Sequence, residues 1–303
     1  MKQSWQAVVD SLDEGKRIDS FVSLRCPNFV RSLATDENTL FFVDNKPVKK
    51  GRKLKEGETV TVQWQESPQF SDLEAQDISL NILYEDKEIL VINKQQSLVV
   101  HPGAGNLDNT LVNALIYRYG ENFFNLEEES VRPGIVHRLD KETSGVMVVA
   151  LNREAHNNLS LQFQNRSVVK TYIALVHGVV DKRMMRIETP LIRDPKDRRR
   201  FTVSKIDKGK SALTEYRLLR QIGSFGLLKV TILTGRTHQI RVHLSSIGLP
   251  IVGDSVYGRN SDYPMMLHAF SLKIKHPKSD KELTFRAPLP LRFKELIRQY
   301  SDD

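Results

Sequence analysis

Residues 132–151 read RPGIVHRLDKETSGVMVVAL, in which a polar loop runs directly into an apolar segment. The apolar part, residues 145–151, is rich in valine and predicts a buried strand. The loop before it carries Asp140, flanked by Arg138 and Lys141. A loop held by a buried strand can aim a carboxylate into a cleft, and the neighbouring positive charges favour its ionised form. Asp140 is therefore a candidate catalytic residue, although an aspartate near an arginine is more often part of a structural ion pair.

Similar short runs recur along the chain and predict further strands. They lie at residues 89–92, 172–176 and 228–233. Asn152 can cap a helix in which Ala155, Leu159 and Phe163 recur at every fourth position. These segments do not alternate regularly between strand and helix, as a doubly wound sheet requires. We therefore expect a mixed α+β domain over residues 79–303.

We expect a smaller module over residues 1–66, joined by a polar, acidic linker over residues 67–78. The predicted elements of the module are a short amphipathic helix that begins within 15–22, a strand at 40–43 with a turn at 44–46, and a second strand at 60–64. Residues 49–55 form a basic connector between the two strands.

The composition excludes several classes of protein. A single cysteine, Cys26, cannot form an internal disulfide or a metal cluster, which excludes the disulfide-rich secreted class and favours the reducing cytosol. The N-terminus has no apolar signal-peptide core, and no stretch reaches the roughly 18 apolar residues of a membrane-spanning helix. We therefore expect a soluble cytoplasmic protein in which Cys26 only packs.

The net charge of +8 is distributed unevenly along the chain. Residues 71–160 carry a net −7 and residues 161–260 a net +12. The excess is greatest in a segment that we call the basic band: Arg193, Lys196, Arg198, Arg199, Arg200, Lys205, Lys208 and Lys210. Such a band favours a polyanionic partner, because release of condensed counterions from phosphates drives binding. A solvated basic loop explains the same charge equally well.

A second polar segment, residues 234–244, leaves a predicted strand through Gly235 and enters a predicted helix. His238 and Arg241 are three residues apart and share one side of this helix. Arg236, Arg241 and the N–H groups of the first turn would suit a phosphate or a carboxylate. The alternative is an ordinary charged flank of a helix.

Tyr172 stands at the start of a predicted strand, in the segment Lys170-Thr171-Tyr172. Its ring could stack on a base or a sugar, and its hydroxyl could meet a carboxylate or an arginine. Most tyrosines in such a position are residues at the edge of the core, so this segment alone assigns no function.

Taken together, the three polar segments resemble the signature of the RluA-type pseudouridine synthases: HRLDKETSG at 137–145, KTY at 170–172 and GRTHQIRVH at 235–243. VVHPGAGN at 99–106 and VGDSVYG at 252–258 resemble the RluD-like branch, which acts on large-subunit ribosomal RNA. The resemblance covers about residues 80–290. It implies the pseudouridine synthase fold, with a mixed, mainly antiparallel sheet, and an isomerase that uses no cofactor and no metal.

The same resemblance assigns roles to single residues. Asp140 matches the catalytic aspartate, Tyr172 the active-site tyrosine and Arg241 the arginine that pairs with the aspartate. Arg138 matches the position that fills the gap left by a flipped-out nucleotide. The reaction cuts the N-glycosidic bond of uridine, rotates the uracil and rejoins it through carbon. The expected partner is ribosomal RNA or a precursor of the large ribosomal subunit, and the expected state is a monomer.

Residues 1–66 resemble the small α/β RNA-binding domain of the ribosomal-protein S-four type, which commonly precedes this catalytic domain. GKRID at 15–19 and VDNKPVKK at 43–50 match its ends. The middle is short and carries Asp36-Glu37, and Asp44-Asn45 replaces the usual Asn-Gly turn. The expected RNA-binding residues are Arg138, Arg236 and His238 in the catalytic domain, and Arg31, Lys46, Lys49 and Lys50 in the module.

Three alternatives remain open. The substrate could be transfer RNA or another ribosomal site, because the choice of base and loop depends on shape and flanking contacts that motifs do not encode. A non-catalytic RNA-binding or ribosome-assembly protein would also carry a basic band. A metal-dependent hydrolase would use His101, His137, His238 and His243, but none of the usual metal-ligand spacings occurs among them.

Overall fold

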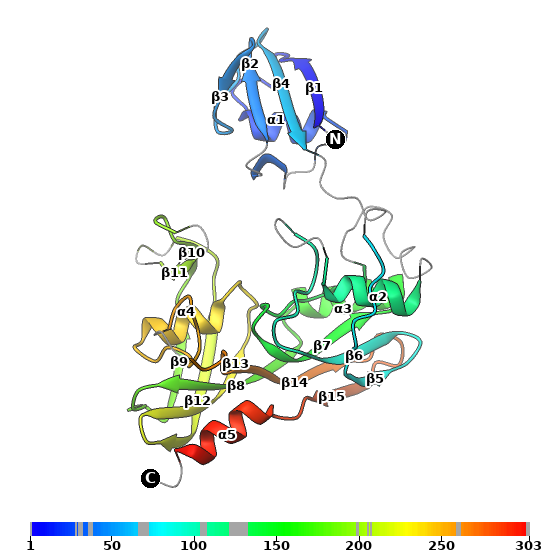
Figure 1. Cartoon of the computed structure of the whole chain (residues 1–303). Coiled ribbons are helices and arrows are strands. Elements are labelled where there is room, and N and C mark those ends of the chain that lie inside the picture. Colours follow the sequence, from blue (N-terminus) through cyan, green and yellow to red (C-terminus); the bar gives the residue numbers. More distant parts are fainter. Residues whose placement is uncertain are drawn as a thin grey trace. The chain divides into compact units, whose positions relative to one another are not determined.

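The computed structural model describes residues 2–27, 29, 33–35, 39–65, 73–103, 108–120, 133–197, 200–204, 206, 208–258 and 262–300. The chain divides into two compact units, Met1–Asp72 and Leu73–Asp303 (Figure 1). Several features named above lie outside the described residues: Arg31, Asp36-Glu37, residues 67–72 of the expected linker, residues 104–106, and Arg198, Arg199 and Lys205 of the basic band.

The first unit contains a four-stranded antiparallel sheet in the order β1-β4-β2-β3. Its elements are β1 (Lys2–Val8), α1 (Ile18–Arg25), the short 3-10 helix η1 (Leu33–Thr35), β2 (Leu40–Val43), β3 (Lys46–Val48) and β4 (Thr59–Gln65). Val60 and Val62 of β4 share a core with Phe21 of α1 and with Cys26, which is buried. The predicted helix, turn and two strands are confirmed. The sequence pattern does not predict β1, because Val8 is its only β-branched residue.

The turn between β2 and β3 accommodates the replacement of Asn-Gly by Asp44-Asn45. Both residues have positive φ, 49° and 60°, as the two central residues of a type I′ hairpin turn require. Aspartate and asparagine tolerate this left-handed region better than most residues. The Asp44 side chain also accepts a hydrogen bond of 3.0 Å from the backbone N–H of Thr59. The hairpin therefore forms without glycine.

The second unit is built on a nine-stranded sheet in the order β5-β6-β7-β14-β8-β13-β12-β9, with β15 paired to β14. The strands are β5 (Ile82–Glu85), β6 (Ile89–Lys94), β7 (Ser144–Ala150), β8 (Val169–His177), β9 (Met184–Glu188), β12 (Leu213–Ile222), β13 (Phe225–Ile232), β14 (Leu267–Lys275) and β15 (Glu282–Arg286). Neighbours are antiparallel except β7 and β14, which are parallel. The expected mixed, mainly antiparallel sheet is confirmed.

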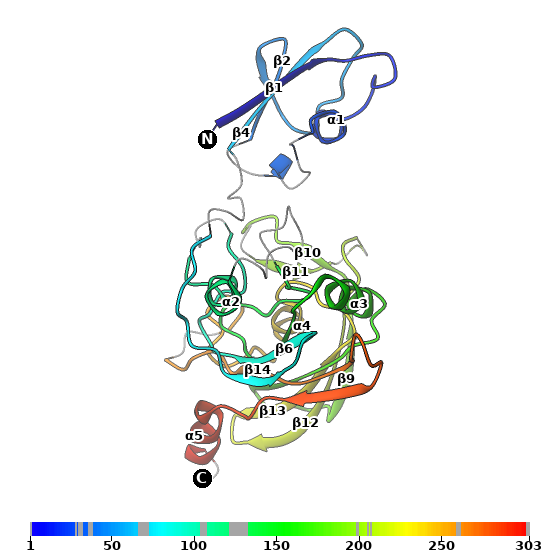
Figure 2. The ribbon, with the colours of Figure 1, turned by 90° about the vertical axis from the view of Figure 1, so that its right-hand side faces the viewer.

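Helices cover both faces of this sheet. They are α2 (Leu111–Tyr119), α3 (Arg153–Gln164), α4 (Gln239–Ser246) and α5 (Leu291–Gln299). On β7, Met147 packs with Leu115 of α2, whereas Val148 packs with Leu159 of α3. Because successive strand residues point to opposite faces, α2 and α3 cover opposite faces; both are seen end-on in Figure 2. Within the described part of the chain, no helix is long and apolar enough to cross a membrane.

The helix predicted after Asn152 is confirmed as α3. The Asn152 side chain accepts a hydrogen bond of 2.8 Å from the backbone N–H of Ala155, which caps the helix at its first turn. Ala155 and Leu159 are buried against the sheet. The position of this helix is thus set by a local cap and an apolar stripe, both of which can be read from the sequence.

Ala269 of β14 connects the two strands that carry the candidate site. It pairs with Gly145 of β7 on one side and with Tyr172 of β8 on the other. Gly145 has a φ of 119°, and a Cβ at this position would collide with the backbone of Ala269. Only glycine therefore allows β7 to approach β14 here. The loop that carries Asp140 consequently ends one strand away from the start of β8, with β14 between them.

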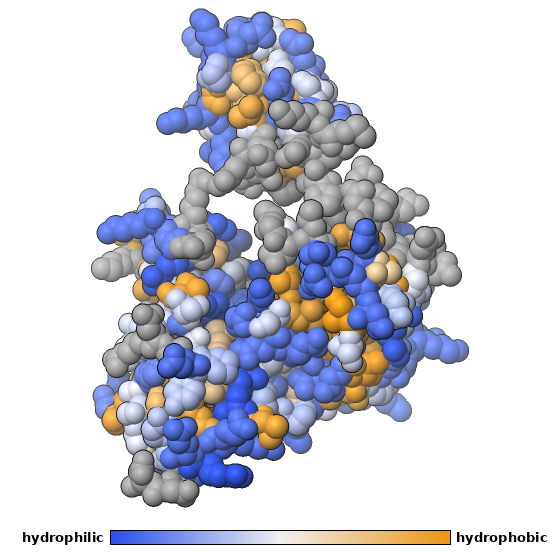
Figure 3. All heavy atoms as spheres, viewed as in Figure 1, coloured by the Kyte–Doolittle hydropathy of each residue, from blue (hydrophilic) through white to orange (hydrophobic). Residues whose placement is uncertain are grey.

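A two-stranded ribbon, β10 (Leu191–Arg193) and β11 (Phe201–Val203), carries part of the basic band. Figure 1 shows it standing away from the nine-stranded sheet, and Figure 3 shows hydrophilic side chains over it. The guanidinium carbon of Arg193 lies 5.3 Å from the ring centroid of Phe201. That of Arg200 lies 5.2 Å from the ring centroid of Tyr257. Cation–π contacts with aromatic rings thus stabilise the positions of Arg193 and Arg200.

Candidate active site

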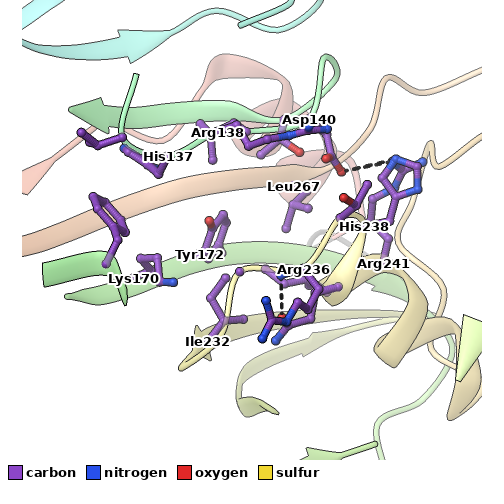
Figure 4. Close-up of a pocket in the computed structure, with 18 of the residues that line it drawn as sticks. His137, Arg138, Asp140, Lys170, Tyr172, Ile232, Arg236, His238, Arg241 and Leu267 are labelled. Carbon is purple, nitrogen blue, oxygen red and sulfur yellow. Dashed lines mark hydrogen bonds and ion pairs between the residues drawn. The ribbon is translucent and has the colours of Figure 1, made fainter. Parts of the chain in front are cut away.

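A cleft of about 360 Å³ is lined by the loop before β7, the start of β8 and the connection from β13 to α4 (Figure 4). Its lining includes Arg138, Asp140, Tyr172, Arg236, His238 and Arg241. The structure therefore brings together all three candidate catalytic residues and all three RNA contacts expected in this domain, from segments far apart in the sequence.

Arg241, on α4, lies between two carboxylates. Its Nη1 donates a hydrogen bond to Asp140 Oδ2 at 3.2 Å, and its Nε and Nη2 donate to the two oxygens of Asp254 at 2.7 and 2.8 Å. The Asp254 side chain is fully buried, whereas those of Arg241 and Asp140 are 8% and 19% exposed. Burial alone would raise the pKa of Asp254, but the hydrogen bonds and charge of Arg241 lower it below its ordinary value. Asp254 is therefore charged and fixes the guanidinium toward Asp140.

The sequence predictions gave Asp254 no role, although it stands within the quoted segment 252–258. Its Oδ1 also accepts hydrogen bonds from the backbone N–H groups of Val256 and Tyr257, at 2.9 and 3.1 Å. An aspartate that accepts hydrogen bonds from the N–H groups two and three residues ahead is typical of a turn. The sequence of this segment therefore predicts a turn and no contact with Arg241. Its contact with Arg241 depends on how the turn packs against α4, which no sequence spacing encodes.

His238 is held in one orientation beside the carboxylate. It has a φ of 58° and its Nδ1 lies 2.9 Å from the hydroxyl of Tyr257. That hydroxyl accepts a hydrogen bond of 2.7 Å from the N–H of Phe201 and can donate its own hydrogen to Nδ1. A neutral His238 would then carry its proton on Nε2, which lies 3.9 Å from Asp140 Oδ2. Burial lowers the pKa of His238, although the charge of Asp140 opposes this.

Tyr172 forms part of the wall of the cleft. The residue is only 7% exposed, and Figure 4 shows its side chain between Lys170 and the group formed by Asp140, His238 and Arg241. Burial, followed by the charge of Asp140, raises the pKa of the Tyr172 hydroxyl. The hydroxyl is therefore neutral at physiological pH, and the ring offers an apolar face next to the carboxylate.

The turn that begins α4 is locked by Gln239. Its Oε1 accepts hydrogen bonds from the Thr234 hydroxyl at 2.7 Å and from the backbone N–H of Arg236 at 3.0 Å. Its Nε2 donates to the carbonyl of Leu213 at 2.9 Å and to the hydroxyl of Thr214 at 3.0 Å. The backbone N–H of Arg236 is thus already occupied within the protein. Of the two ligands considered for this segment, a carboxylate is the one that Arg241 meets.

Residues 88–246 match the RNA pseudouridylate synthase family. The chain belongs to this family. It is 44% identical to an uncharacterized RNA pseudouridine synthase of Aquifex aeolicus, with 93% of each chain covered. It is 38% identical to the ribosomal large subunit pseudouridine synthase D of Borreliella burgdorferi, over 91% of this chain and 87% of that one. The solved structure of human RNA pseudouridylate synthase domain containing 1 is similar with a TM-score of 0.58 and 27% identity, over 76% of this chain and 97% of that one.

The chain is therefore an RNA pseudouridine synthase, an isomerase, and the resemblance to the RluA-type enzymes and their RluD-like branch is confirmed. A non-catalytic RNA-binding protein and a metal-dependent hydrolase are no longer needed as explanations of the motifs.

Lys94 is a buried residue of the synthase that the sequence predictions missed. Its Nζ donates hydrogen bonds to the backbone carbonyls of Gln95, Leu98 and Lys141, at 2.9, 2.8 and 3.1 Å. Burial lowers the pKa of Lys94 to about 7, although the charge of Asp140 opposes this. The bond to Lys141 ties the end of β6 to the loop immediately after Asp140.

His137, another of the histidines considered as metal ligands, makes packing and hydrogen-bond contacts in the synthase. His137 lines the cleft, but its Nε2 accepts a hydrogen bond of 3.0 Å from the N–H of Val148 and its ring stacks on Phe163 at 4.6 Å. Burial lowers the pKa of His137 to about 3, so the ring is neutral. Among the described residues, no group of three potential metal ligands occurs.

The expected RNA contacts in the first unit are far less constrained. Lys46, Lys49 and Lys50 are exposed. Three arginines of this unit are in ion pairs: Arg17 with Asp19, Arg25 with Asp10 and Asp13, and Arg52 with Glu58.

Proposed function

We propose that this synthase converts uridines of large-subunit ribosomal RNA to pseudouridine, with Asp140 as the catalytic residue and without a cofactor. The observation that carries the proposal is the position of Asp140, in a cleft between the buried arginine–carboxylate pair and the ring of Tyr172. The choice of ribosomal RNA is supported by relatives at 36–38% identity that are named ribosomal large subunit pseudouridine synthase D.

The chemistry needs an ionised carboxylate near the anomeric carbon. Asp140 would attack that carbon or stabilise the positive character that develops there as the bond to N1 breaks. The detached uracil then rotates and forms the new bond through C5. C5 loses a proton and N1 gains one, so the isomerisation is redox-neutral. Arg241, itself fixed by Asp254, would orient Asp140 and stabilise its charged form.

Tyr172 and Arg138 would handle the nucleotide. The target base must leave its stack, which costs on the order of a few kcal/mol. The ring of Tyr172 would stack on the extruded uracil, and the neutral hydroxyl could help to move a ribose proton. Arg138 is exposed beside the cleft and would fill the gap that the nucleotide leaves in the RNA.

We also propose that the first unit is a degenerate RNA-binding domain of the S-four type. Its exposed cations Lys46, Lys49 and Lys50, together with Arg31, would contact phosphates. The ion pairs of Arg17, Arg25 and Arg52 leave those three arginines less able to do so, which supports a weak contribution to RNA affinity. A monomer that acts on ribosomal RNA in the cytoplasm is the simplest form of the proposal.

The test is conversion of unmodified large-subunit RNA by the purified protein, with pseudouridine mapped at single-nucleotide resolution. Asp140→Asn should abolish conversion while RNA binding stays largely intact, because the amide keeps the shape but not the charge. Glu142→Gln, two residues further along the same loop, is the matched control and should remain active. An active Asp140→Asn variant would contradict the assignment of Asp140. Conversion of transfer RNA in place of ribosomal RNA would keep the chemistry and replace the substrate.

A further inference from the structure

The cleft is electrostatically divided. Asp140, His238 and Arg241 lie on one side, where Asp254 completes the ion pair, and Lys170 lies on the other, beyond Tyr172 (Figure 4). In the part of the chain that the structure describes, neither Lys170 nor Arg236 forms an ion pair with a carboxylate. One side of the cleft is thus neutralised within the protein, and the other is cationic and unneutralised.

Lys170 is a half-buried cation at the start of β8. Its Nζ reaches the backbone carbonyl of Thr234 at 3.5 Å and lies 5.9 Å from the ring centroid of Phe163. The same nitrogen lies against Gly235, where a Cβ would be 3.6 Å away. The ammonium group therefore faces the β13–α4 connection. Among the described residues, its one hydrogen-bond acceptor is the neutral carbonyl of Thr234, at the long distance of 3.5 Å.

Arg236 supplies a second cation close to Lys170. Its Nε donates a hydrogen bond of 3.1 Å to the carbonyl of Ser211, and its backbone N–H is taken by Gln239. The bond from Nε fixes the side chain of Arg236, which lines the cleft, and its terminal nitrogens donate no hydrogen bond among the described residues. The pKa of Lys170 is lowered to about 8 by burial and then by the positive charges of Arg236 and Arg166. Three cations therefore repel one another around this side of the cleft, a situation that a bound anion would relieve.

We propose that Lys170 and Arg236 form a phosphate subsite, which holds the phosphodiester next to the target uridine. The inference rests on the proposed function, because the RNA substrate is what brings anions to this cleft. The only anionic groups of RNA are its phosphates. Lys170 and Tyr172 are two residues apart on β8 and both line the cleft. Strand residues at this spacing point to the same face, about 7 Å apart, so a nucleotide with its base on Tyr172 can place its phosphate on Lys170.

The subsite would give the enzyme a second fixed point on the nucleotide. With the base against Tyr172 and the phosphate on Lys170 and Arg236, the ribose between them would be presented to Asp140 from a defined side. Binding at such a point raises the rate chiefly by orientation. Lys170 would thus be a substrate-binding residue, distinct from the group that carries the chemistry.

The experiment measures kcat/KM for conversion of unmodified large-subunit RNA at a series of salt concentrations. Lys170→Met keeps the apolar stem and removes the charge; we expect kcat/KM to fall roughly ten- to a hundredfold. The slope of log kcat/KM against log salt concentration should become shallower by about 0.7, the value for one phosphate contact on a single strand. Lys170→Arg should retain most of the activity. Arg236→Met should lower kcat/KM in the same way. In the double variant, the two losses in kcat/KM should combine less than additively on the free-energy scale, because both residues would bind the same phosphate.

Lys229→Met is the matched control, since Lys229 pairs with Ile173 across β8 and β13 and so points to the opposite face from Lys170 and Tyr172. It removes the same charge and should behave like the wild type. A Lys170→Met variant that matches Lys229→Met in rate and salt slope would overturn the proposal. A lower rate with an unchanged salt slope would also overturn it, because the contact would then be to an uncharged group. If Lys170→Met does not fold, Arg236→Met decides by the same two readouts. A wild-type protein that converts no uridine would instead refute the proposed function.

Discussion

Arginine–carboxylate pairs occur in both units, but in very different surroundings. In the second unit, Arg241 and Asp254 are 8% and 0% exposed, and Arg241 also reaches Asp140. In the first unit, Arg52 and Glu58 make a bidentate pair of similar geometry, with both bonds at 2.7 Å, but the arginine is 33% exposed. Water screens the charges of Arg52 and Glu58, but it has little access to Arg241 and Asp254. The same two residue types therefore orient the proposed catalytic aspartate in one place and form a partly exposed ion pair in the other.

The largest expected effect is the loss of Asp254. Asp254→Ala leaves the buried Arg241 with only the partly exposed Asp140, and removal of one partner of a buried pair costs about 3–5 kcal/mol of unfolding free energy. Activity should also fall at least a hundredfold, because the guanidinium is no longer fixed. Urea unfolding and kcat/KM measure the two effects. Glu188→Ala, which removes a 61% exposed carboxylate on β9, is the control. A loss of less than 1 kcal/mol for Asp254→Ala would show that the pair is not stabilising.

The next largest effect is the loss of unfolding free energy in acid, which should occur in different pH ranges in the two units. Burial lowers the pKa of His268 to about 4, reinforced by the charge of Arg292. The unfolded chain, with an ordinary histidine pKa near 6.5, then binds a proton that the folded chain does not. The unfolding free energy of the second unit should therefore fall as the pH drops from 6.5 to 4, by about 1.4 kcal/mol per pH unit for this residue.

The first unit contains no histidine. In it the hydrogen bond from Arg52 lowers the pKa of Glu58 to about 2, so this contribution is lost only as the pH falls from about 4.5 toward 2. Both tryptophans, Trp5 and Trp64, lie in the first unit, so their fluorescence reports it alone, and near-UV circular dichroism of the tyrosines reports mainly the second. His268→Gln should reduce the pH dependence of the second unit, in which the buried His137 still contributes, and should leave that of the first unit unchanged. Parallel unfolding curves for His268→Gln and the wild type would contradict the prediction.

The smallest effect is expected for the partly exposed pair of Arg52 and Glu58. Arg52→Met should lower the unfolding free energy of the first unit by about 1 kcal/mol, because water reaches the arginine and screens the pair. Pseudouridine formation should not change. Tryptophan fluorescence during urea unfolding at low and high salt measures the difference, which should shrink further as salt is added. A loss as large as that of Asp254→Ala would remove the contrast between the two pairs.

Local patterns in the sequence were sufficient for much of the fold. The valine-rich run after Gly145 is β7, and Asn152 caps α3 where the fourfold apolar spacing begins. The tight turn at Asp44-Asn45 was also predicted. These features depend on residues within a few positions of one another, because strand propensity, helix capping and turn conformation are set mainly by neighbouring residues. β1 was missed because its neighbours in the sheet, not its composition, make it a strand.

The sequence by itself determined which residue types are available for chemistry: an aspartate on a polar loop, a tyrosine at a strand start, and arginines at a helix start. Only the tertiary structure decided how they are used. Asp254 becomes the partner of Arg241 because a turn packs against α4, and Lys94 secures the loop by reaching a carbonyl 47 positions away. Within the described residues, the fold places Lys170 near the cations Arg236 and Arg166 and in no ion pair with a carboxylate. The physical reason is that charge pairing and burial depend on distances in space, which the order of residues along the chain does not specify.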